Sequence, residues 1–88
     1  MPDEITGQID FVLLFAMVHE VPDKSRLFET VYAMLKPGGR ILFAEPGGHV
    51  PLQSFQQSVL VAESIRLKVS ENIRIRGSHA VVLMKASL

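Results

Sequence analysis

The hydrophobic positions of this chain fall into short runs that predict alternating strands and helices. In residues 9–18, the side chains at both odd and even positions are apolar after Asp10. This pattern is typical of a strand that is buried on both faces, as in a parallel sheet. A second apolar run extends from Arg40 to Glu45 and is followed by the turn sequence Pro46-Gly47-Gly48. We therefore predict two buried strands.

A predicted helix separates the two strands. Asp23 is a suitable N-cap, and apolar side chains then recur at helical intervals over residues 27–35. Lys36-Pro37-Gly38-Gly39 combines a basic residue, a proline that cannot continue the helix and two conformationally free glycines. The pattern predicts a helix over residues 24–35 that stops at this sequence.

The second half of the chain repeats the alternation. Pro51 is a good first helical residue, and one apolar stripe follows it, so we expect a helix over residues 51–66. That stripe consists of Leu52, Phe55, Val59, Ala62 and either Ile65 or Arg66. Residues 68–75 and 79–85 are strand-like and are joined by Arg76-Gly77-Ser78, which predicts a hairpin.

The predicted fold class is α/β, with the order strand, helix, strand, helix, strand, strand in a single domain over residues 1–88. We expect a four-stranded, mostly parallel sheet with an antiparallel last strand. Right-handed crossovers would place both helices on the same face of this sheet. The other face would then need a cover from elsewhere.

Composition excludes several function classes. Nine basic and nine acidic residues leave no net charge, so neither nucleic acid nor an anionic membrane is an expected partner. The chain has no cysteine, which excludes disulfides, thiolate catalysis and Cys-based zinc sites. The apolar run of residues 9–18 is too short to span a bilayer, and no targeting segment is recognisable, so a cytoplasmic location is the default expectation.

The order of several motifs resembles the C-terminal half of a class I S-adenosylmethionine-dependent methyltransferase of the ubiquinone/menaquinone-biosynthesis type. Residues 10–23 are similar to that family's fourth strand and the loop after it. Leu35-Lys36-Pro37-Gly38-Gly39 is the most specific element, and Glu45-Pro46 and residues 78–85 match later segments. The resemblance implies a partial Rossmann-like methyltransferase fold and methyl transfer to a small molecule.

The same resemblance implies that S-adenosylmethionine is the cofactor. Family members carry a Gly-rich turn and an acidic ribose-binding residue ahead of the fourth strand. Neither feature precedes Asp10 in this sequence. We therefore expect the chain alone to bind the cofactor weakly or not at all, and to be inactive or incomplete in isolation.

Candidate site residues lie where the strands end, because open parallel sheets bind ligands at the carboxyl ends of their strands. The resemblance implies cofactor contacts from Phe15, Ala16 and Met17, whereas His19, Glu45 and His49 would face the substrate. His79 should lie on the same edge. Solvated loop residues would show the same pattern. No histidine pair has i, i+4 spacing, so we predict no metal site. Methyl transfer needs little acid–base chemistry beyond positioning the nucleophile, and we assign no catalytic base.

Two functions of different kinds remain open. The first is part of an enzyme, either a half that a partner chain completes or a truncated piece of such an enzyme. The second is a non-catalytic module that assembles through its uncovered sheet. The second hypothesis predicts a homo-oligomer, most simply a two-fold dimer.

Overall fold

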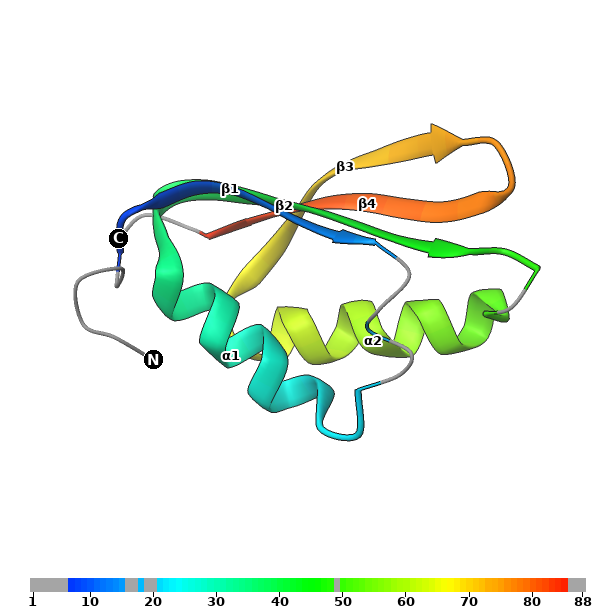
Figure 1. Ribbon diagram of the computed structural model, residues 1–88, viewed down its shortest axis with the longest axis horizontal. Coiled ribbons are helices and arrows are strands. Elements are labelled where there is room, and N and C mark those ends of the chain that lie inside the picture. Colours follow the sequence, from blue (N-terminus) through cyan, green and yellow to red (C-terminus); the bar gives the residue numbers. More distant parts are fainter. Residues whose placement is uncertain (1–6, 16–17, 19–20, 49, 86–88) are drawn as a thin grey trace.

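The computed structural model describes residues 7–15, 18, 21–48 and 50–85 and has the predicted order of elements. Both helices lie under the same face of one four-stranded sheet (Figure 1). The elements are β1 (Ile9–Phe15), α1 (Lys24–Met34), β2 (Leu35–Pro46), α2 (Leu52–Ser64), β3 (Leu67–Ile75) and β4 (Ser78–Lys85).

The strand order is β1-β2-β4-β3. β1 and β2 pair in parallel, whereas β4 pairs antiparallel with both β2 and β3. Three strands therefore share one direction and β4 runs against them, which confirms the predicted α/β class. Because β4 lies between β2 and β3, β1 and β3 form the two edges of the sheet.

The start of β2 differs from the prediction. Asp23 caps α1 as expected, with its Oδ1 accepting a hydrogen bond from the Arg26 backbone N–H at 3.0 Å. The helix ends at Met34, and the chain enters the sheet at Leu35 rather than at Arg40. Pairing along β1 and β2 steps from Ile9↔Leu35 to Phe11↔Arg40, so the Lys-Pro-Gly-Gly sequence forms an irregular bulge instead of a loop outside the sheet.

The core lies between the sheet and the two helices. Phe43 of β2 is fully buried at its centre, with the ring of Phe28 edge-on to it at 5.6 Å and the ring of Phe55 stacked on it at 4.7 Å. These rings join α1, β2 and α2 into one cluster. The predicted stripe of α2 is therefore correct at Phe55 and Ala62, but Leu52 is exposed.

The opposite face of β1 carries large apolar side chains that no element covers among the described residues. Phe11, Leu13 and Phe15 expose 55%, 56% and 51% of their surface, whereas Leu14, which points to the helices, is buried. β1 is thus buried on one face only. Both helices lie on one face of the sheet, as predicted, and these exposed side chains lie on the other face.

Candidate functional site

The carboxyl ends of β1 and β2 meet at one edge of the sheet, where β4 begins. Phe15 ends β1 opposite Ala44, and Glu45 of β2 lies opposite His79 of β4. This edge is where parallel sheets place their ligands, so we call the end of β1, the end of β2 and the start of β4 the rim.

Glu45 organises the rim from inside. Only 1% of its surface is exposed, and its Oε1 accepts a hydrogen bond from the Val18 backbone N–H at 3.1 Å. Val18 is itself fully buried. The carboxylate therefore ties the segment after β1 to the end of β2.

His79 has a positioned ring. Its Nε2 lies 3.0 Å from the carbonyl oxygen of Val50, and because a carbonyl only accepts, Nε2 carries the hydrogen and donates it. The ring also lies 5.5 Å from that of Phe55. His79 thus connects the rim to α2 and the core.

The turn after β2 approaches the backbone of the β3–β4 hairpin closely. The N–H of Gly47 donates to the carbonyl of Gly77 at 2.8 Å, and a Cβ at Gly47 would lie 3.2 Å from that same oxygen. The turn after β2 and the β3–β4 hairpin are thereby joined beside the rim. Glycine at position 47 permits this contact.

The sequence-predicted site residues divide into two groups. Phe15 is half-exposed at the rim and Glu45 is buried there. Ala16, Met17, His19 and His49 lie outside the described residues. The described part of the chain has no group of three metal-ligating side chains, and neither of its helices is long and apolar enough to span a membrane.

A separate concave feature lies beside the rim, between α2 and the β3–β4 hairpin. This cleft has a volume of about 790 Å³. Its apolar lining includes Phe55 and Val59 of α2 and Val69 and Val81 of the hairpin. Sequence reasoning missed it because a cleft between a helix and a twisted hairpin has no local motif.

Comparison with known proteins identifies the family. The family described as "Methyltransferase domain" matches residues 1–79. The chain belongs to the methyltransferase domain family. The predicted resemblance to class I S-adenosylmethionine-dependent methyltransferases is thereby confirmed.

Curated relatives point to the same class. This methyltransferase domain is 39% identical over 79 residues to a ubiquinone biosynthesis O-methyltransferase of Pseudomonas savastanoi pv. phaseolicola. The matching region covers 90% of this chain and 31% of that protein. A protein of the same name from Pseudomonas putida GB-1 is 36% identical over 44 residues, covering 50% of this chain and 19% of the relative. The chain thus spans less than a third of the length of these relatives.

Solved structures confirm the fold. A type 11 methyltransferase from Sulfolobus solfataricus superposes with a TM-score of 0.75 at 21% sequence identity. The superposition covers 100% of this chain and 57% of the Sulfolobus chain. An S-adenosylmethionine-dependent methyltransferase from Methanosarcina mazei superposes with a TM-score of 0.72 at 15% sequence identity, over 100% of this chain and 64% of the Methanosarcina chain. The methyltransferase domain therefore has a partial Rossmann-like fold.

Proposed function

We propose that this methyltransferase domain supplies part of the site of an enzyme that transfers a methyl group from S-adenosylmethionine to a small molecule. The family and the names of its relatives support this class of reaction. One structural observation carries the proposal to this chain. The hydrogen bond from the Val18 N–H to Glu45 holds Val18 at the carboxyl-terminal edge of a parallel strand pair, and open parallel sheets bind their ligands at this edge.

The proposed roles follow from position along the rim. Phe15 offers a half-exposed ring for an apolar part of the cofactor, and Ala16 and Met17 continue the same segment. His19 and His49 are the candidates to face the methyl acceptor. The carboxylate of Glu45 is buried, so we assign it to shaping the loop rather than to direct contact with the acceptor.

Bound S-adenosylmethionine would supply an electrophilic methyl group on a sulfonium, and the protein's main task would be to hold the acceptor in line with it. The described rim fits only a small part of this cofactor. Glu45, the carboxylate at the rim, is buried and cannot bind ribose hydroxyls there. We therefore propose that the chain alone binds the cofactor weakly, and isothermal titration calorimetry tests this. A dissociation constant in the low micromolar range, about −8 kcal/mol, would contradict it.

A chimera tests the enzymatic role. The 79 matching residues of the Pseudomonas savastanoi relative would be replaced by the corresponding residues of this chain. We expect the folded chimera to retain methyl transfer, and Phe15→Asp in it to weaken cofactor binding at least about tenfold, because a charge replaces an apolar contact. Leu60→Asp on the exposed side of α2 is the matched control. A folded chimera without methyl transfer would refute the proposal.

The apolar face of β1 favours a second function, assembly with a second copy of the chain, in which Phe15 would contact the other copy in place of the cofactor. Phe11, Leu13 and Phe15 are half-exposed on one face of an edge strand. A two-fold axis at that edge, perpendicular to the sheet, would pair the outer backbone groups of two β1 strands and bring both apolar rows together on one face. A partner chain that completes the sheet would use the same surface, and the mass of the assembly distinguishes the two.

A further inference from the structure

The cleft between α2 and the β3–β4 hairpin has the size and lining of a small-molecule site. Its volume of about 790 Å³ lies within the range of roughly 300–1,000 Å³ that is usual for such sites. The side chains of Phe55 and Val59 form one wall, and those of Val69 and Val81 lie on the hairpin side. An apolar chain or ring would find contacts on both sides.

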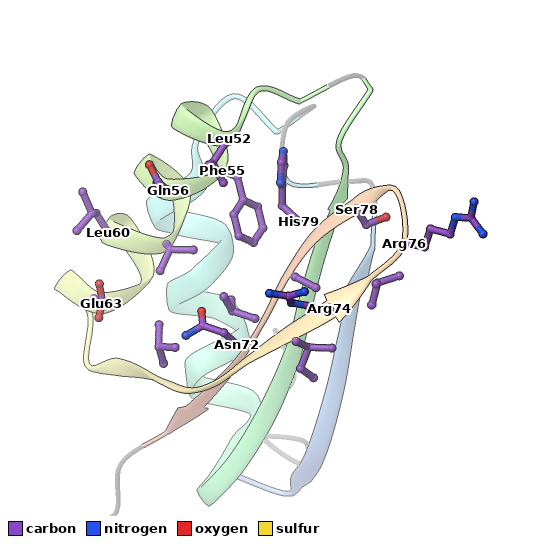
Figure 2. Close-up of a pocket in the computed structure, with 16 residues that line it drawn as sticks. Leu52, Phe55, Gln56, Leu60, Glu63, Asn72, Arg74, Arg76, Ser78 and His79 are labelled. Carbon is purple, nitrogen blue, oxygen red and sulfur yellow. The ribbon is translucent and has the colours of Figure 1, made fainter.

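Two arginines line this cleft, and they extend in different directions. Figure 2 shows Arg74 extending from β3 toward the α2 wall, with Asn72 beside it, whereas the side chain of Arg76 extends outward from the hairpin turn. The register agrees, because Arg74 pairs with His79 on the face of the sheet that carries the helices. Of the two arginines, Arg74 is therefore the one that extends toward the α2 wall of the cleft.

Arg74 is not paired with a carboxylate in the part of the chain that the structure describes. Within the described residues, its guanidinium makes no ion pair and no hydrogen bond; the ion pair there joins Lys36 and Asp10. Glu63 lines the opposite wall, on α2, but does not pair with Arg74 (Figure 2). A guanidinium presents a planar set of donors that matches a carboxylate, and an adjacent apolar wall strengthens such a pair.

We propose that the cleft binds amphipathic carboxylates, with the apolar part between α2 and the hairpin and the carboxylate on Arg74. Asn72 adds a neutral donor next to the guanidinium. This site is distinct from the cofactor contacts proposed at the end of β1, since α2, β3 and β4 form it. It does not depend on methyl transfer.

The test uses decanoate, below its micelle-forming concentration, as an amphipathic carboxylate, with decanol and acetate as probes of the apolar and anionic parts alone. Amide chemical shifts of the 15N-labelled chain would be followed during each titration. We expect decanoate to bind at least about tenfold more tightly than either probe, with shifts in α2, β3 and β4. No saturable decanoate binding, or shifts confined to β1, would overturn the proposal.

Two exposed substitutions assign the charge. Arg74→Gln keeps a polar side chain and should weaken decanoate binding about tenfold while leaving decanol binding unchanged. Arg26→Gln, at an exposed position on α1 away from the cleft, is the matched control and should change neither. Equal decanoate affinity in wild type and Arg74→Gln would refute the role of Arg74. Cofactor titration of the same samples keeps this result separate from the methyltransferase proposal.

Discussion

The Oε1 atom of Glu45 accepts a hydrogen bond from the Val18 backbone N–H across 27 positions of sequence. Both residues are buried: Glu45 lies near the end of β2, and Val18 follows the end of the neighbouring parallel strand β1. The bond fixes where the chain goes after β1. The geometry of the candidate cofactor edge therefore depends on a carboxylate that does not itself face outward.

Glu45→Ala should destabilise the fold. The substitution leaves the buried Val18 N–H without its acceptor, at a cost of about 1–3 kcal/mol. Glu45→Gln keeps an amide oxygen at the same place and should cost less. Urea unfolding measures both, with the exposed Glu71→Ala as control, expected within about 0.5 kcal/mol of wild type. Equal stability of Glu45→Ala and wild type would show that this bond contributes nothing.

A second prediction concerns the bulge at the start of β2. A Cβ at Gly39 would lie 2.8 Å from the Lys36 carbonyl oxygen and 3.1 Å from that of Ile9. Gly39→Ala should therefore cost about 1–3 kcal/mol, because backbone atoms would have to shift. Gly48→Ala meets open space and is the matched control. Thermal melts of both variants provide the comparison, and similar midpoints would argue against this bulge geometry.

Leu35→Asp should unfold the domain. Leu35 is fully buried at the point where α1 ends and β2 begins, so an unpaired carboxylate would enter the core. The cost is roughly 3 kcal/mol or more, a large share of the stability of a domain this size. Leu60→Asp makes the same change at a position that is 63% exposed. Circular dichroism should show native structure only in the second variant.

The repeating elements of this fold could be predicted from local sequence. Helical spacing located α1 and α2, Asp23 marked a helix start, and the Gly77 turn marked the hairpin. Local patterns failed at Leu35. Its apolar side chain continues the helical stripe, but its backbone is extended and starts β2, because pairing with Ile9 outweighs helical spacing.

Contacts between distant segments could not be predicted in this way. The Lys85 ammonium donates to the carbonyls of Tyr32 and Leu35 at the end of α1, 53 and 50 positions away. A lysine at the end of a strand gives no local sign of this role. The candidate edge was predicted because strand direction determines it, whereas the cleft at Arg74 depends on how α2 packs beside the hairpin.

The last prediction is that the chain forms a homodimer through β1. Phe11, Leu13 and Phe15 are half-exposed, so their burial would contribute about 1 kcal/mol each in each copy. Analytical ultracentrifugation at micromolar concentration should give twice the mass of the 9.8 kDa chain. A larger complex with a second protein would instead indicate a partner that completes the sheet.

A charge in the middle of this row tests the location of the contact. Leu13→Lys should shift the equilibrium to monomer, because a two-fold axis perpendicular to the sheet at the β1 edge would bring the two ammonium groups close together in an apolar contact. Leu60→Lys introduces the same charge at an exposed leucine of α2 and should leave the dimer intact. The variants should keep native circular dichroism, since neither position is in the core. A well-folded wild-type monomer, or a dimer that Leu60→Lys dissociates and Leu13→Lys does not, would refute assembly through β1.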